Sequence, residues 1–356
     1  MPAFRSMTPT TRMPATAAAT LAVDIGGANT KAAWLDGEAL RTVSRPFEVW
    51  RDREALAAVL RDVAAEVSAG PTDGVAITMT AELSDAFRTK REGVGFVLDA
   101  AQEAFGDRTL SVLTTAGELV SVAAARARPW DVAAANWVAT ALAVARARRD
   151  ALLIDVGSTT ADIVPIAEGR VAATGRNDLQ RLLAGELVYT GVLRTNLAAI
   201  APRVPVPGGW CPVASEYFAI SADVHLVLGH LSPEAYDCPT PDGRAATVAC
   251  ARERIARLVC SDLEQLDAAE VDAIAAFLHG EQLRQLEQAA RRVGAPLPSD
   301  APVVAVGSGA FLGREVASRL GRAVADVPAP WGATGGEVAP AAALAALLAA
   351  RLRQPC

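Results

Sequence analysis

The sequence has few of the side chains that bind zinc or form disulfides. Its 356 residues include three histidines and five cysteines, and no two cysteines are spaced as C-x-x-C. Because zinc sites need cysteine and histidine clusters at short spacings, this composition leaves few ligands for zinc. We expect His225 and His230 to have structural roles. The odd number of scattered cysteines indicates reduced thiols, as in a cytoplasmic protein, rather than a disulfide framework.

The sequence also lacks an excess of positive charge and a long hydrophobic run. Its 34 basic and 40 acidic residues give a formal net charge of −6, whereas non-specific nucleic-acid binding needs a basic face. The apolar stretch near the C-terminus, residues 338–350, contains Pro340 and is too short to span a bilayer. We therefore expect neither nucleic acid nor a membrane as a partner, and we interpret this stretch as a buried helix rich in alanine and leucine.

The first twenty residues lack the continuous apolar core of a signal peptide. They are rich in proline, threonine and alanine, so we expect residues 1–20 to be a disordered leader or to lie upstream of the true start, for which Met7 and Met13 are candidates. Together with the missing membrane segment, this favours a cytoplasmic location.

What the sequence does contain is three glycine-bearing turns, each directly after a short apolar run. They lie in the segments LAVDIGGANTK (residues 21–31), LLIDVGSTTAD (152–162) and VVAVGSGAF (303–311). An apolar run that ends in Asp-x-Gly predicts a buried strand that enters a tight hairpin. The similarity of the first two turns predicts two similar lobes around one cleft, and about 150 residues per domain also predicts two domains for a chain of this length.

Such turns suit a phosphorylated ligand. Glycine lets the backbone approach a ligand closely, and the exposed N–H groups of a turn form a concave anion site. Asp24 and Asp155 end their strands, where a carboxylate can hold Mg²⁺. A basic cluster around Arg88 suits diphosphate or a substrate carboxylate, although it is also compatible with a solvated face. The residues that we predict to bind phosphate are Gly26, Gly27, Asn29, Thr30, Lys31, Arg88, Lys90, Gly157, Ser158, Thr159, Thr160, Gly307 and Gly309.

The spacing of apolar residues predicts the elements between these turns. A period of 3.6 residues predicts helices over residues 52–68, 131–149, 246–260 and 268–290. We expect strands at residues 74–80 and 111–114, and a glycine-rich strand or turn at residues 93–97. The predicted organisation is lobe one at residues 21–150, lobe two at 151–336 with an insertion at about 174–300, and a helix at 337–356 that returns to lobe one.

The order of the three turns resembles that of the actin, sugar kinase and Hsp70-type ATPase superfamily. That resemblance implies an α/β protein with a two-lobed, actin-like (ribonuclease H-like) fold and a cleft between the lobes. Longer phrases at residues 80–94, 185–196, 214–219 and 223–229 resemble the hydantoinase/oxoprolinase-related proteins of tetrahydromethanopterin-linked one-carbon pathways, and this resemblance spans almost the whole chain.

The family resemblance implies a reaction that does not require ATP, although binding of ATP stays possible. In it, an aminomethyl-furan methyl diphosphate is joined to a phenol of tyramine or tyrosine type, and an ether forms as diphosphate leaves. Mg²⁺ and preorganised donors would stabilise the leaving diphosphate. The candidate bases for the phenol are Glu82, Asp85 and Glu118. The candidate substrate contacts, including acidic partners for the aminomethyl cation, are Glu186, Tyr189, Arg194, Glu216 and Asp223.

Plainer interpretations stay open for several of these residues. Glu82 and Asp85 also suit the first turn of a helix, where the helix dipole favours acidic residues. Tyr189 also suits the core or its rim.

Two other functions stay open for the fold as a whole. An ATP-dependent small-molecule kinase or hydrolase would use Gly307 and Gly309 for adenosine and transfer a phosphoryl group. A nucleotide-gated regulatory protein would clamp a partner between its lobes without making a bond. The oligomeric state is open as well, with a homodimer as one option.

Overall fold

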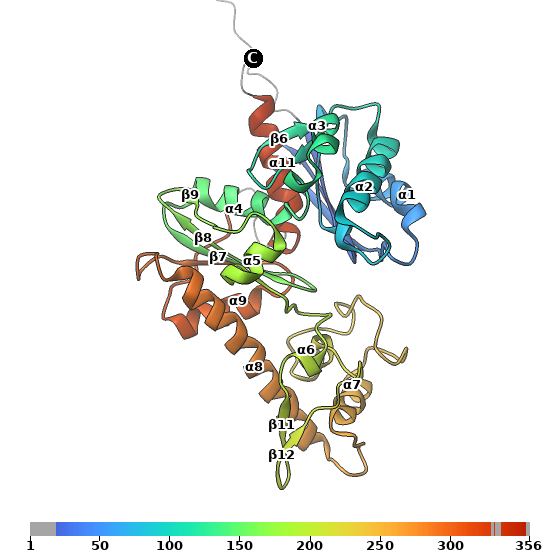
Figure 1. Ribbon diagram of the computed structural model, residues 1–356, viewed down its shortest axis with the longest axis vertical. Helices are drawn as coiled ribbons and strands as arrows, with labels where there is room; N and C mark the ends of the chain where they lie inside the picture. Colours follow the sequence, from blue (N-terminus) through green and yellow to red (C-terminus); the bar gives the residue numbers. More distant parts are fainter. Residues whose placement is uncertain (1–18, 329–330, 332–335, 354–356) are drawn as a thin grey trace, which may run out of the picture.

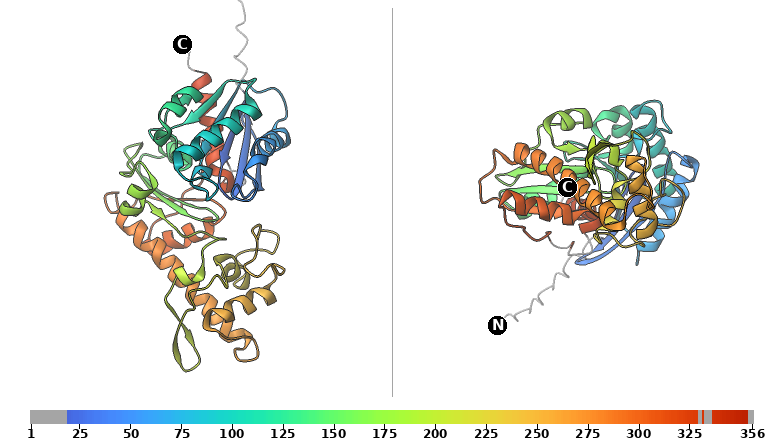
Figure 2. Two further views of the ribbon diagram at one scale, coloured as in Figure 1. Left: turned by 45° about the vertical axis from the view of Figure 1, so that its right-hand side comes forward. Right: turned by 90° about the horizontal axis from the view of Figure 1, so that it is seen from below.

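The computed structural model of the protein describes residues 19–328, 331 and 336–353 (Figure 1). Two mixed sheets, each covered by helices, follow one another along the long axis, and a smaller helical part extends beyond the second sheet (Figures 1 and 2). Within the described residues, no helix combines the length and the apolarity needed to cross a bilayer.

The first sheet has six strands. In spatial order they are β3 (Ala39–Pro46), β2 (Asn29–Asp36), β1 (Thr20–Ile25), β4 (Gly74–Met79), β5 (Leu110–Leu113) and β6 (Leu119–Ser121). Strands β1, β2 and β3 form an antiparallel meander, and β4 and β5 run parallel to β1. Strand β1 is buried on both faces, which is why its sequence is a continuous apolar run rather than an alternating one.

The two faces of this sheet carry different helices. Leu21, Val23 and Ile25 of β1 pack with residues of α1 (Leu56–Val67) and α2 (Lys90–Phe105). Ala22, which points to the opposite face, packs with α11 (Ala339–Leu352). The short helix α3 (Val122–Ala127) follows β6.

The second sheet repeats the antiparallel hairpin of the first. Its strands are β10 (Leu187–Val188), β8 (Ala161–Ala167), β7 (Ala151–Val156) and β13 (Val303–Val306), and β9 (Arg170–Val171) pairs with the far end of β8. The helices α8 (Ala268–Gly294) and α9 (Ala310–Leu320) pack on one face, and α4 (Asn136–Ala147) packs on the other.

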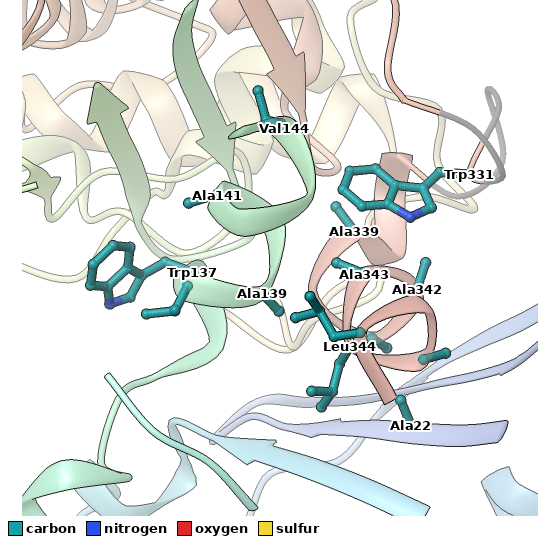
Figure 3. Packing of buried hydrophobic residues seen from close by; sticks show 14 of the residues in the cluster. Ala22, Trp137, Ala139, Ala141, Val144, Trp331, Ala339, Ala342, Ala343 and Leu344 are labelled. Atoms are coloured by element: carbon teal, nitrogen blue, oxygen red, sulfur yellow. The ribbon is translucent and has the colours of Figure 1, made fainter. Parts of the chain in front are cut away.

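The two sheets are joined by a core of small side chains around α4 and α11. Figure 3 shows α11 between α4 and β1, with Ala139 and Ala141 on α4, Ala342 and Ala343 on α11, and the indole of Trp331 beside them. Alanine allows close approach of the two helices, and most residues of α11 are buried. The C-terminal apolar stretch is therefore a buried helix, as its composition predicted.

The smaller helical part has its own core. It contains the hairpin β11 (Arg203–Val206) and β12 (Gly209–Pro212), α6 (Ser221–Val227), α7 (Val248–Ala256) and the N-terminal half of α8. Helix α5 (Asp178–Ala184) lies instead beside the second sheet, before β10.

The four predicted helices are present, but one local prediction is wrong. Residues 93–97 do not form a strand or turn, because they lie inside α2, which begins after the Thr89 cap. The glycine at position 93 serves a helix contact: a Cβ there would lie 2.6 Å from the Cα of Glu82. Residues 1–18 of the expected leader lie outside the described residues, and Thr20 already belongs to β1.

Candidate functional site

The first and second glycine turns have the same backbone structure. In each, the N–H of the first glycine donates to a carbonyl three residues later: Gly26 to Asn29 at 3.1 Å and Gly157 to Thr160 at 2.8 Å. The two turns also meet each other, because the Asn29 side-chain amide donates to Ser158 Oγ at 3.4 Å. The fold thus brings the two hairpins to opposite sides of one cleft, as the repeated Asp-x-Gly pattern predicted.

Two carboxylates that precede these turns are buried near one another. Asp24 is 5% exposed and Asp155 is 7% exposed, and the Asp24 Oδ1 atom has no hydrogen-bond partner. Burial raises the pKa of Asp24 to about 6, against the lowering effects of Lys31 and of the Asn136 side chain. Burial and the charge of Asp162 raise the pKa of Asp155 to about 7, with a smaller contribution from Asp24.

Asp162 is the third member of this carboxylate group. It lies opposite Asp155 in the β7–β8 pair, as Lys31 lies opposite Asp24 in the β1–β2 pair. Burial raises the pKa of Asp162, although the guanidinium of Arg181 donates to its Oδ1 at 2.6 Å and lowers the pKa in part. Like charges in a buried site disfavour one another unless a cation lies between them.

These carboxylates suit a magnesium ion. Mg²⁺ prefers hard oxygen donors, and it binds through one or two carboxylates together with substrate phosphates. The unpartnered Oδ1 of Asp24 and the raised pKa of Asp155 are the features expected of oxygens that a cation would satisfy. Asp24 and Asp155 would hold the ion, and Asp162 would hold its water shell.

A cavity of about 470 Å³ opens beside the turns. It is lined by both lobes: by the first turn and the segment after β4 on one side, and by the second turn and the segment around β10 on the other. The lining residues are Gly27, Ala28, Trp50, Thr80, Glu82, Leu83, Ser84, Asp85, Ala134, Asn136, Trp137, Thr159, Thr160, Asp162, Asp178, Arg181, Leu182, Leu187, Tyr189 and Arg194.

Glu82 is the buried carboxylate of this cavity. It is 1% exposed, and neither of its side-chain oxygens has a hydrogen-bond partner. Burial raises the pKa of Glu82 to about 7, and the charge of Lys90 offsets this only in part. A carboxylate with a pKa near neutrality can accept a proton at physiological pH and is therefore suited to act as a general base.

The cavity also has an aromatic and arginine-rich side. The Arg194 guanidinium stacks 4.9 Å above Trp50, and both of its terminal nitrogens donate to Glu48 Oε1 at 3.0 Å. The Arg181 guanidinium stacks 4.1 Å above Trp137. Tyr189 and Trp50 are partly exposed at the rim, so an aromatic ligand can reach them.

The third glycine turn packs directly on the second. A Cβ on Gly307 would lie 2.6 Å from Asp155 Oδ1, and Gly307 has a φ of +87°, which favours glycine. The N–H of Gly309 donates to the carbonyl of Val156 at 2.8 Å. Neither glycine lines the 470 Å³ cavity, and both contact the end of β7 instead.

Several predicted site residues have other surroundings. Glu118 is exposed in the turn between β5 and β6, and Glu216 is exposed before α6. Arg88 is exposed before α2, and Lys90 forms an ion pair with Asp178, a residue of the cavity wall. Asp85 lines the cavity at its exposed edge.

Glu186 and Asp223 are buried in contacts of their own. Glu186 accepts hydrogen bonds from the backbone and hydroxyl of Thr174 and from the N–H of Gly175. Asp223 pairs with Arg254 at 2.7 Å, and it accepts a hydrogen bond from the Tyr236 hydroxyl at 3.1 Å. These contacts hold loops and helices together, and neither carboxylate lines the cavity.

Sequence reasoning missed several residues of the site, among them Asn136, Trp137, Asp162 and Arg181. One of them had a signal in the sequence. Asp162 follows Asp155 by seven positions, as Lys31 follows Asp24, and this equal spacing places each pair opposite one another in a hairpin. The other three lie on α4 and α5, and nothing local in the sequence marks them as neighbours of the turns.

The duplicated hairpin sheets, the cleft between them and the buried carboxylates define a two-lobed protein of the actin-like α/β class. The chain belongs to the hydantoinase/oxoprolinase family, which it matches over residues 73–351. A nucleotide-free acetone carboxylase structure shares this fold, with a TM-score of 0.56 and 12% identity over 93% of this chain and 70% of that one.

Two curated relatives carry the same name, (4-{4-[2-(γ-L-glutamylamino)ethyl]phenoxymethyl}furan-2-yl)methanamine synthase. The protein from Methanocaldococcus jannaschii is 36% identical over 269 residues, which cover 75% of this chain and 79% of the relative. The protein from Methanococcus vannielii is 43% identical over 122 residues, which cover 34% of this chain and 54% of the relative.

Proposed function

We propose that this protein is a synthase that joins an aminomethyl-furan methyl diphosphate to the phenol of a tyramine- or tyrosine-type compound in methanofuran-type cofactor synthesis. The observation that carries the proposal is a pair of matched glycine turns beside an aromatic-lined cavity, in a chain 36% identical to a synthase whose name contains a phenoxymethyl furan. The phenol oxygen attacks the furfuryl carbon, the bond from that carbon to the diphosphate oxygen breaks, and diphosphate leaves with the electron pair.

The diphosphate binds at the two matched turns. The N–H groups of Gly26 and Gly157 are used to close the turns themselves. The backbone amide of Gly27 and the hydroxyls of Ser158 and Thr159, which lie where the two turns meet, can donate to phosphate oxygens. Mg²⁺ on Asp24 and Asp155 supplies positive charge to the leaving group, and Lys31 adds to it. Preorganised donors of this kind stabilise the charge that develops on the diphosphate as it leaves.

Glu82 accepts the proton of the phenol. Its carboxylate is buried in the cavity wall, and its pKa of about 7 makes it a stronger base than an ordinary glutamate. Trp137 and Tyr189 form the walls against which a phenol ring packs, and Arg194 holds Trp50 at the rim.

The aminomethyl cation pairs with an acidic residue of the cavity. Asp85 is the exposed carboxylate of its wall, so we assign this role to Asp85 rather than to Glu186, Glu216 or Asp223, which lie outside the lining.

The protein acts in the cytoplasm on small molecules, in agreement with the free cysteines at positions 211, 238, 250 and 260.

The experiment is a direct assay of ether formation. The chain is incubated with the furan diphosphate, Mg²⁺ and one of three phenols (tyramine, γ-glutamyltyramine or tyrosine), and products are measured by mass spectrometry and diphosphate release. We expect an ether and one diphosphate per ether with at least one phenol, and no product from an Asp155→Asn variant. Absence of any ether, together with ADP release from ATP that depends on a metabolite, would instead support a kinase of the same fold that uses Gly307 and Gly309.

A further inference from the structure

All three histidines of the chain lie together, although His279 is 49 positions beyond His230 in the sequence. His225 is on α6, His230 follows that helix, and His279 is on α8. One ring nitrogen of each histidine lies within 4.8 Å of a ring nitrogen of the other two. We propose that these three histidines form a binding site for a transition-metal cation, with zinc as the expected ion. None of them lines the proposed synthase cavity, so this site is separate from the one described above.

The chain turns back after α6 to place His230 beside His225. Gly229 has a φ of +73°, a conformation that favours glycine at the end of a helix. The N–H of His230 then donates to the carbonyl of His225 at 2.8 Å. The ring of Phe311 lies 5.2 Å from both imidazole rings and supports their orientation.

A chain of hydrogen bonds determines which ring nitrogen of His225 carries the proton and which carries the lone pair. The amide nitrogen of Gln282 donates to the Gly191 carbonyl at 2.9 Å, which fixes the Gln282 oxygen on the side of His225. That oxygen lies 3.0 Å from His225 Nε2, so Nε2 carries the proton and Nδ1 carries the lone pair. His225 Nδ1 in turn lies 3.4 Å from His230 Nδ1, and each of these nitrogens can face a shared ion.

The third histidine has the same arrangement. His279 Nε2 lies 3.3 Å from the carboxylate of Glu315, which therefore accepts its proton, and its buried Nδ1 has no hydrogen-bond partner. A histidine that binds a metal through one nitrogen commonly donates from the other to a carboxylate or a carbonyl oxygen. Gln282 and Glu315 supply these two outer partners.

The separation of two of the ring nitrogens suits a tetrahedral ion. With metal–nitrogen bonds of about 2.0–2.1 Å, two ligands of a tetrahedral zinc lie roughly 3.3–3.4 Å apart, which matches the 3.4 Å between His225 Nδ1 and His230 Nδ1. His230 is exposed, and we assign the fourth position to water.

Imidazole ligands select the class of ion. They suit zinc, copper, iron and nickel, whereas Mg²⁺ prefers oxygen ligands such as those of Asp24 and Asp155.

An ion on the three histidines would fix α6 against α8. Through Gln282 it would also fix the segment at Gly191, whose neighbour Val192 donates to the Gly157 carbonyl at 3.0 Å.

The test uses the untagged full chain, stripped with a chelator, and measures zinc by calorimetry and Co²⁺ by its visible absorption. We expect one zinc per chain, tetrahedral Co²⁺ bands that zinc removes, and a higher melting temperature with zinc than with Mg²⁺. His230 is exposed, so the His230→Gln variant should fold normally, which far-UV circular dichroism checks. We expect this variant to lose zinc affinity by at least about 10- to 100-fold. Cys260→Ser, a change of another exposed candidate ligand, should bind as the wild type does.

A second variant keeps the test independent of His230. Glu315→Ala removes the outer partner of His279 without removing a ligand, and we expect about a 10- to 100-fold loss of zinc affinity. The proposal is overturned if the wild type binds much less than one zinc per chain, or if His230→Gln and Glu315→Ala both bind zinc as tightly as the wild type. Either result would mean that the histidines only pack together.

Discussion

Three carboxylates of the cleft are buried close to one another, and this is unfavourable for their ionised forms unless a cation lies between them. Asp24, Asp155 and Asp162 lie close together in a buried region, and burial raises the pKa of each. Such an arrangement lowers the stability of the protein at neutral pH unless a ligand compensates. The stability of the metal-free protein therefore reports on the site, without any assay of the reaction.

Asp155→Asn is expected to stabilise the metal-free protein at pH 8. The folded protein holds a proton on Asp155 up to about pH 7, whereas its ordinary pKa is 3.8, so the stabilising contribution is full below pH 3.8 and is lost as the pH rises through about 7. The asparagine carries no charge and avoids this loss, which should raise the melting temperature by a few degrees at pH 8 in scanning calorimetry.

Two comparisons make that result specific. Asp107→Asn, which changes an exposed carboxylate, should leave the melting temperature unchanged. Mg²⁺ should raise the melting temperature of the wild type but not that of Asp155→Asn. Equal melting of wild type and Asp155→Asn at pH 8, with and without Mg²⁺, would contradict the assignment of Asp155 as a metal ligand.

Glu82→Gln is expected to reduce kcat by about 10²- to 10⁴-fold, the usual contribution of a general base. The wild-type rate should rise with pH through about 7, because Glu82 must be ionised to take the phenol proton and its pKa is about 7. Steady-state rates between pH 5 and 9 measure this limb, which should be absent in the glutamine variant. Survival of the same limb in Glu82→Gln would assign it to another group.

At the scale of elements, the site depends on how closely α2 approaches the segment after β4. Gly93 permits that approach, and it keeps Glu82 in the cavity wall. This feature explains why the sequence alone predicted the wrong element at residues 93–97. Glycine is a weak helix former, and the contact that requires it involves a residue eleven positions earlier in the chain.

Gly93→Ala and Gly95→Ala form a matched pair within α2. The first adds a methyl group that meets the Glu82 backbone, and we expect a loss of about 1–3 kcal/mol in the free energy of unfolding and a lower kcat. The second adds a methyl group with no atom within 4 Å, and we expect unchanged or slightly higher stability. Urea titrations measure both, and a destabilised Gly95→Ala with an unaffected Gly93→Ala would refute this account of the helix contact.

Other elements were predictable because their signal is local. The apolar runs before Asp24 and Asp155 identified β1 and β7, and their turns identified the two hairpins. The neighbours that complete the cavity come from elsewhere: Trp137 from α4 and Arg181 from α5. Neither has a spacing that marks it, because its role depends on the packing of helices across the two lobes.

At the scale of the whole molecule, the two lobes are connected through a helix–helix contact. Helices α4 and α11 pack together through alanines, and α11 also covers the first sheet (Figure 3). The two hairpin turns meet at one side of this contact, so Asn29 of one lobe contacts Ser158 of the other. The diphosphate site that we propose therefore needs both lobes together.

The most direct test of the central claim is calorimetric titration of inorganic diphosphate into the protein, with and without Mg²⁺. We predict one site per chain that requires Mg²⁺, is lost in Asp24→Asn and Asp155→Asn, and is retained in Glu118→Gln, whose carboxylate lies outside the cavity lining. Diphosphate binding of equal affinity without Mg²⁺, or in the Asp155→Asn protein, would contradict a metal-held diphosphate between the two hairpins.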